Sequence, residues 1–284
     1  MYIDTHTKKA MEESIYKYLG IDEKVLCNIF DKAYNSDYDS LETIFSDFIY
    51  KYIKKNSVDE ILFFHFSRRL NSENDDFRGY NLYDLLLNDT VVSSFLKKYD
   101  IIFKKGEKHL ELFHRGKLET FENVHGGNES NVKWRMGYYE GREDYCFNGF
   151  AFKDLLYKNS YARSLYWGPE FLNQMLQVIG REDVLEEYIK NSKYYCLGYK
   201  IPIEKVIFDR YDTLSLEGKK NRIVLEVLRR LYDYYVTNIS YMYDEENPCL
   251  RLQDDDTMDN KYLVFKVLSS TLGAPNHSYI SQIK

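Results

Sequence analysis

A histidine, a serine and two arginines follow one another at the end of a hydrophobic segment of this chain. Residues 61–66 form a short, nearly continuous apolar run that contains His65. Ser67, Arg68 and Arg69 come directly after it. Such a run is typical of a strand covered on both faces, and a strand end is a rigid place for a site. Because guanidinium groups match phosphate oxygens, the pattern predicts a site for a phosphate-bearing ligand.

The same side chains also fit a purely structural interpretation. His65 can be a core histidine whose hydrogen bonds are satisfied inside the fold. The two arginines can pair with acidic residues of the polar segment that follows, which are Glu73, Asp75 and Asp76. Sequence alone leaves both interpretations open.

A run of three aspartates, Asp254 to Asp256, follows a short apolar segment near the end of the chain. Aspartate-rich loops bind hard cations, but this run lacks the alternate spacing and central glycine of a calcium-binding loop. A solvated loop is the simpler interpretation. A cation site is the alternative, since the run comes just after a predicted strand.

Three further histidines are candidate ligands. His109 and His114 are five positions apart. On a strand that spacing places them on opposite faces, so we do not expect them to share a metal ion. His125 lies in residues 123–141, which we predict to be the longest loop, and long loops often carry function.

One short pattern is similar to a metal-dependent nuclease site. Asp209 and Asp212 precede Glu217 and Lys219, and in such sites carboxylates hold Mg²⁺ while a lysine polarises the phosphate. Here the pattern falls at a predicted loop-to-helix junction. The acidic balance of the chain gives no help in attracting DNA.

Hydrophobic periodicity predicts helices first and strands with hairpins afterwards. Residues 1–57 read as a helical segment, with Asp22 and Asp39 as helix caps. Residues 58–284 read as an α+β domain with one continuous core. The predicted fold class is α+β, with amino-terminal helices packed on a mixed, largely antiparallel sheet with flanking helices. Other expected elements are a hairpin at 101–113, a helix capped by Asn81, a helix at 219–235, and strands at 146–152, 194–201, 206–208, 250–252 and 262–267.

Composition narrows the classes of partner. The 284 residues carry a formal net charge of −6, so the basic footprint of a nucleic-acid-binding protein is absent. No apolar run approaches the roughly 20 residues of a membrane span, and we expect no membrane association. The cysteines at 27, 146, 196 and 249 are too far apart for a sequence-local zinc or redox pair. A cytoplasmic location is expected, with a nucleotide or another protein as partner.

The order of elements over residues 58–267 resembles the ADP-ribosyltransferase fold. Residues 63–69, followed by the segment 81–86 that begins Asn-Leu, are similar to the opening of the branch of that family that uses a histidine. The hairpin at 101–113 and the strands at 194–201 and 206–208 match later sheet elements. The resemblance implies an NAD-consuming transferase.

The resemblance also implies roles for individual residues. His65 would hydrogen-bond a ribose of NAD, and Ser67 and Arg68 would position ribose or phosphate. Tyr157 or Tyr161 would stack on the nicotinamide.

A carboxylate would stabilise the oxocarbenium-like transition state of the glycosidic cleavage. The last predicted strand departs from the family because it has no glutamate at a matching position. The available carboxylates are Asp256, Asp259 and Glu204.

Three classes of function are therefore expected from the sequence. The first is an NAD-dependent ADP-ribosyltransferase-like protein or a degenerate relative of one. The second is a non-enzymatic interaction protein, of a phage or a bacterial defence locus. The third is a metal-dependent nuclease.

Overall fold

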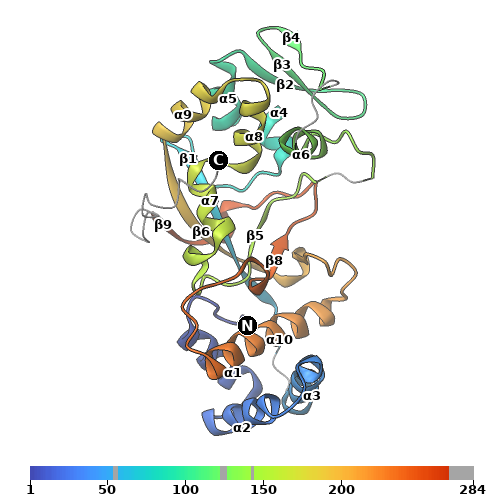
Figure 1. Ribbon diagram of the computed structural model, residues 1–284, viewed down its shortest axis with the longest axis vertical. Coiled ribbons are helices and arrows are strands. Elements are labelled where there is room, and N and C mark those ends of the chain that lie inside the picture. Colours follow the sequence, from blue (N-terminus) through green and yellow to red (C-terminus); the bar gives the residue numbers. More distant parts are fainter. Residues whose placement is uncertain (54–56, 122–126, 142–143, 269–284) are drawn as a thin grey trace. The chain divides into compact units, whose positions relative to one another are not determined.

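The computed structural model describes residues 1–53, 57–121, 127–141 and 144–268. The chain divides into two compact units, each assembled from separate stretches of sequence (Figure 1). Unit 1 contains Met1–His65, Asn148–Ala162 and Gly198–Arg251, and unit 2 contains Phe66–Phe147, Arg163–Leu197 and Leu252–Lys284. The helices predicted over 1–57 belong to unit 1, whereas the domain predicted over 58–284 contributes to both units.

Four long helices belong to unit 1. They are α1 (Lys8–Leu19), α2 (Glu23–Tyr34), α3 (Leu41–Tyr52) and α10 (Leu216–Val236). The first three contact α10, and Figure 1 shows them gathered around it. The apolar stripe of α10 is buried, and it includes Ile223, Val227 and Leu231. Burial of this stripe stabilises the unit, because a helix within a protein gains most of its stability from packing of its apolar face.

Local sequence signals set the ends of these helices. The Asp22 side chain accepts a hydrogen bond from the Val25 N–H at 2.9 Å, which confirms the predicted cap of α2. Gly20 ends α1 in the left-handed conformation, with φ of 65°. The cap predicted at Asp39 is wrong, because Asp39 lies inside a short 3-10 turn and α3 begins only after Ser40.

A six-stranded sheet has the order β7-β8-β5-β1-β6-β9. Its strands are β1 (Glu60–Leu70), β5 (Asn148–Phe150), β6 (Ser192–Pro202), β7 (Ile207–Phe208), β8 (Cys249–Arg251) and β9 (Leu263–Leu268). The pairings β1–β5, β5–β8 and β7–β8 are antiparallel, with Phe64 opposite Phe150 and Phe208 opposite Leu250. β1 and β6 each continue from the residues of one unit into those of the other.

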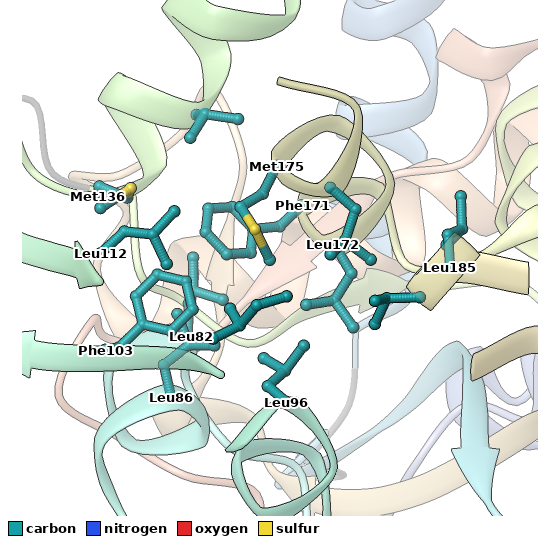
Figure 2. Packing of buried hydrophobic residues seen from close by; sticks show 14 of the residues in the cluster. Leu82, Leu86, Leu96, Phe103, Leu112, Met136, Phe171, Leu172, Met175 and Leu185 are labelled. Carbon is teal, nitrogen blue, oxygen red and sulfur yellow. The ribbon is translucent and has the colours of Figure 1, made fainter. Parts of the chain in front are cut away.

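Unit 2 contains a smaller antiparallel sheet and several helices. The sheet consists of β2 (Ile101–Lys105), β3 (Leu110–His114) and β4 (Lys117–Leu118), which confirms the predicted hairpin. The helices are α4 (Leu82–Leu87), α5 (Val91–Lys97), α6 (Gly127–Arg135), α8 (Glu170–Val178) and α9 (Glu182–Lys190). Their apolar side chains interlock in one cluster, in which Phe103 and Leu112 of the sheet meet Phe171 and Met175 of α8 (Figure 2).

The remaining elements are short. α7 (Ser160–Ser164) is a single turn, and 3-10 turns occur at Tyr38–Ser40, Leu156–Lys158, Leu165–Trp167, Ile203–Lys205, Asp244–Glu246 and Asn260–Tyr262. Within the described part of the chain, no helix combines the length and the apolar content that crossing a membrane requires.

The structure confirms the α+β class and corrects one prediction about a loop. Residues 123–141 were expected to lack regular structure, but α6 occupies Gly127–Arg135. The segment is polar, yet Val132 and Met136 are four positions apart and both fully buried. Glu129 is buried as well, and the positions 129, 132 and 136 lie on one helical face that packs against the core. His125 lies outside the described residues.

Candidate functional site

His65 is half-buried on β1, and its ring has a fixed hydrogen-bond partner. Nδ1 lies 2.7 Å from the main-chain oxygen of Asn148 in β5. A carbonyl oxygen only accepts, so Nδ1 carries the proton and donates it. This bond sets both the tautomer and the orientation of the imidazole.

Side chains along β1 alternate between its two faces, so His65 and Arg68 point to opposite faces although they are close in sequence. His65 and Ser67 therefore share one face, where both are half-buried. Arg68 faces the other way with Phe64 and Phe66, and all three are buried.

The Arg68 guanidinium is bound to main-chain carbonyls. Its Nε donates to the carbonyl oxygen of Tyr166, and its Nη1 donates to those of Ile189 and Ser192 at 3.1 and 3.2 Å. Burial lowers the pKa of this arginine. Its hydrogen bonds therefore connect β1 to the main chain at three other residues of unit 2. The predicted contact of Arg68 with a phosphate stays a prediction.

Arg69 pairs with an acidic residue of the polar segment that follows it, as the structural interpretation of the sequence predicts. Its Nη1 lies 3.5 Å from Asp75 Oδ1, and its Nη2 donates to the Arg78 carbonyl oxygen at 2.7 Å. The pairing with the next polar segment is thus confirmed for Arg69. For Arg68 it is wrong, because buried carbonyl groups take the place of carboxylates.

The predicted catalytic acids lie in different units. Glu204 is an exposed residue of unit 1, and its main-chain oxygen accepts a hydrogen bond from Lys219 Nζ at 2.9 Å. Asp259 belongs to unit 2 and caps a 3-10 turn by accepting from the Lys261 N–H at 3.0 Å. That bond and the Lys261 ammonium lower the pKa of Asp259. Tyr157 and Tyr161 are exposed residues of unit 1.

The nuclease-like pattern is engaged in other interactions. Asp212 pairs with Arg251 at 2.8 Å. Lys219 is the donor to the Glu204 main chain, and burial lowers its pKa. Within the described ranges, Asp209, Asp212 and Glu217 do not form a group of ligand atoms close enough to share a metal ion.

A group of metal-ligand type does occur in unit 2. One ligand atom each from Asp144, Cys146 and Asp254 lie within 4.8 Å of one another. Cys146 is buried and the two aspartates are half-buried. Asp254 is the first residue of the aspartate run for which a cation site was the alternative prediction.

Hydrogen bonds from outside and inside the group orient both carboxylates. Arg135 Nη1, at the end of α6, binds Asp144 Oδ2 at 2.5 Å. The Cys146 thiol donates to the other oxygen of Asp144 at 3.2 Å. The Tyr145 N–H donates to Asp254 Oδ1 at 3.1 Å. Outer hydrogen bonds of this kind fix the carboxylate ligands of metal centres in proteins.

Main-chain bonds hold the two segments that carry these residues. The Leu252 N–H donates to the Phe147 carbonyl oxygen at 3.0 Å, and the Leu82 N–H, at the start of α4, donates to that of Tyr145 at 2.8 Å. Gly79 and Met258 exchange a pair of hydrogen bonds of 2.9 and 2.7 Å. The group is therefore mounted on backbone that is anchored on both sides.

The net charge of the group is compatible with a bound cation. Burial raises the pKa of the Cys146 thiol, and the nearby Asp144 carboxylate raises it further. Two carboxylates, one guanidinium and a neutral thiol leave one negative charge. A divalent ion that displaces the thiol proton brings the sum to zero, which suits a half-buried place.

The distances between the ligand atoms can be compared with those of a tetrahedral zinc site. Zinc–ligand bonds of 2.0–2.3 Å place the ligands of a tetrahedral site about 3.5 Å apart. The three atoms lie within 4.8 Å of one another, and Cys146 Sγ is 3.2 Å from Asp144 Oδ1. Rotation of the side chains is therefore enough to bring the three atoms to the spacing of zinc ligands.

Part of this group could have been found in the sequence. Asp144 and Cys146 are two positions apart, and on extended backbone such residues share a face. The proximity of Asp254 to these two residues could not be predicted from sequence, because Asp254 is remote from them in the chain.

No known protein family model, curated protein or solved structure matches this chain.

Proposed function

We propose that this protein binds a divalent transition-metal ion of the zinc class through Asp144, Cys146 and Asp254. The observation that carries the proposal is the convergence of one thiol and two oriented carboxylates within 4.8 Å. Thiolate ligands favour zinc over the hard ions Mg²⁺ and Ca²⁺, which prefer sites made of oxygen alone. Three protein ligands leave the fourth tetrahedral position for water or for a ligand.

Calorimetric titration of the full chain with Zn²⁺ tests this proposal. We expect about one ion per chain and an affinity that rises with pH, because the raised pKa of Cys146 makes the ion compete with a proton. Cys146→Ser and Asp254→Asn should each weaken binding at least about tenfold.

The matched control is Cys27→Ser, which removes a half-buried thiol of α2 in unit 1. It should bind Zn²⁺ as the unchanged protein does. A folded chain that takes up no zinc, or a Cys146→Ser variant with undiminished affinity, contradicts the proposal.

A second candidate function is the NAD-consuming transferase that the sequence resembles. The observation that favours it is the imidazole of His65, whose orientation and tautomer the Asn148 carbonyl oxygen fixes at 2.7 Å. A ring held in this way keeps its other nitrogen in a fixed direction, which suits a contact with a ribose. Two exposed tyrosines of the same unit, Tyr157 and Tyr161, are the expected stacking partners.

Transfer of labelled ADP-ribose from NAD tests this second function. His65→Ala should abolish transfer and leave the far-ultraviolet circular dichroism unchanged. His109→Ala, which alters a histidine of unit 2 that packs on Tyr138, should transfer label normally. Absence of transfer by the unchanged protein, or full transfer by His65→Ala, eliminates this candidate.

A further inference from the structure

The three proposed ligands lie just beyond the end of the ladder between β5 and β8. The ladder continues for one more pair past the two strands, since the Leu252 N–H donates to the Phe147 carbonyl oxygen at 3.0 Å. Two residues further, the same antiparallel count places Tyr145 opposite Asp254. Here the Tyr145 N–H donates at 3.1 Å to a side-chain oxygen, Asp254 Oδ1. The carboxylate of Asp254 therefore takes the place of a main-chain acceptor at the end of the ladder.

Residues 253–257, which we call the strap, connect β8 to the segment that leads into β9. The ends of the strap are anchored, because Leu252 before it and Met258 after it are both buried. Met258 also exchanges main-chain hydrogen bonds of 2.9 and 2.7 Å with Gly79. Inside the strap every second residue, starting from Gln253, is exposed. The strap is therefore fixed at its ends and partly in solvent along its middle.

Side-chain contacts hold the middle of the strap. The Asn81 amide donates to the main-chain oxygen of Asp256 at 3.4 Å, which is long for a hydrogen bond. The bond of 3.1 Å between the Tyr145 N–H and Asp254 is shorter. The position of the Asp254 carboxylate therefore matters for whether the strap stays closed on the segment 144–146.

A second carboxylate lies beside that of Asp254. One oxygen of Asp144 and one of Asp254 lie within 4.8 Å of each other, and like charges at such a distance repel. Arg135 offsets this repulsion in part, through its bond to Asp144 Oδ2. Asp255 and Asp256 add two further carboxylates to the strap. Without a cation, the charges therefore favour movement of Asp254 away from Asp144.

A divalent ion reverses the sign of this interaction, because a bound cation is the largest charge in such a group. Held by both carboxylates and by the Cys146 thiolate, whose proton passes to solvent, it attracts Asp254 towards the segment 144–146. We propose that the metal ion is a clasp for the strap, which closes when the ion binds and opens locally when it leaves. The clasp rests on the metal function proposed above, and it makes the order of the strap depend on the metal supply.

Hydrogen exchange of the full chain, followed by mass spectrometry, tests the clasp. The protein is compared in about a twofold excess of Zn²⁺ and in EDTA. We expect the main-chain N–H groups of residues 253–257 to exchange at least about tenfold more slowly with Zn²⁺, because exchange there requires local opening. The internal control is α9 (Glu182–Lys190), which carries none of the three ligands and should exchange at an unchanged rate.

Two variants of the aspartate run make a matched pair. Asp254→Asn keeps a side-chain oxygen for the Tyr145 N–H, but it removes the repulsion from Asp144 and weakens metal binding. Its strap should exchange in EDTA no faster than that of the unchanged protein, and Zn²⁺ should slow it less than about twofold. Asp255→Asn removes the neighbouring charge at an exposed position, and should keep the full effect of Zn²⁺.

The outcomes separate the clasp from the metal site itself. If calorimetry shows bound Zn²⁺ while the strap exchanges as it does in EDTA, the clasp is refuted and the metal centre stands. If Zn²⁺ slows α9 as much as the strap, the ion stabilises the unit as a whole and the clasp is again refuted. Faster exchange of Asp254→Asn in EDTA contradicts the role of repulsion. If the folded chain binds no Zn²⁺, both proposals fail.

Discussion

Asp233 on α10 is a carboxyl group whose surroundings oppose its charge. Burial raises the pKa of Asp233 to about 6, and the Arg230 guanidinium opposes this shift only in part. Arg230 itself is buried, and it lies 3.3 Å from both Asp154 and Glu246. The guanidinium is thus shared among several acids, which limits what it contributes to Asp233.

The raised pKa of Asp233 has a consequence for stability. The folded protein keeps a proton on this group between about pH 4 and pH 6, where the unfolded chain has lost it. The free energy of unfolding that this group contributes therefore falls as the pH rises through that window. Asp233→Asn removes the cost, and should stabilise the protein by up to about 3 kcal/mol at pH 7.5 and by less than about 1 kcal/mol at pH 4.

Urea unfolding of both proteins at the two pH values measures this difference. The control is Asp47→Asn, which changes an exposed carboxylate of α3. If the Asp233→Asn protein shows the same advantage at pH 4 as at pH 7.5, the raised pKa is not its cause.

At the scale of residues, sequence predicted the interactions whose partners are local. Asn81 caps α4 by accepting from the Asp84 N–H at 2.7 Å, and Arg69 pairs with Asp75. The partners of Arg68 and of Cys146 come from distant segments. Their spacing in the sequence carries no signal, so neither the carbonyl contacts of Arg68 nor the complete metal centre could be predicted.

Among the elements, β5 depends on a glycine for its pairing with β1. A Cβ at Gly149 would lie 2.4 Å from Phe63 Cε1 and 2.5 Å from the main-chain oxygen of Phe64. Both distances are far below van der Waals contact, and the second atom belongs to the backbone of a central strand. The close approach therefore requires a residue without a side chain.

Gly149→Ala should consequently destabilise the protein by about 2–3 kcal/mol, because the strand must shift to relieve the overlap. The comparison variant is Gly127→Ala at the start of α6, where a Cβ meets nothing within 4 Å. That variant should change stability by no more than about 0.5 kcal/mol. The midpoint of urea unfolding measures both effects, and equal midpoints for the two variants would refute this account of β5.

Helices were easier to predict than short strands, for a physical reason. A helix shows its caps and its periodicity within one segment, as α2 and α10 do. The pairing of β5 with β8 joins residues 148–150 to residues 249–251, and no local pattern indicates which segments pair. The polar composition of α6 concealed a helix in which Val132 is the buried apolar residue and Glu129 the buried polar one.

On the scale of the whole molecule, each unit contains three separate stretches of the chain. The boundary near residue 57 was predicted from a change from helical to strand periodicity. The two units are instead defined by packing between stretches that are remote in the chain. The metal centre depends on this arrangement, because residues 144–146 and 254 belong to different stretches of unit 2. We therefore propose that the folded chain, and not a local motif, brings the three ligands together.

Titration of the full chain with Co²⁺ tests that claim most directly, because a cobalt ion with a thiolate ligand absorbs in the near ultraviolet and a tetrahedral one absorbs in the visible. We predict that both absorptions appear, saturate at about one equivalent, disappear when Zn²⁺ is added, and persist in Cys27→Ser but not in Cys146→Ser. Absorption that survives in Cys146→Ser, or a folded chain that shows none, would contradict the metal centre.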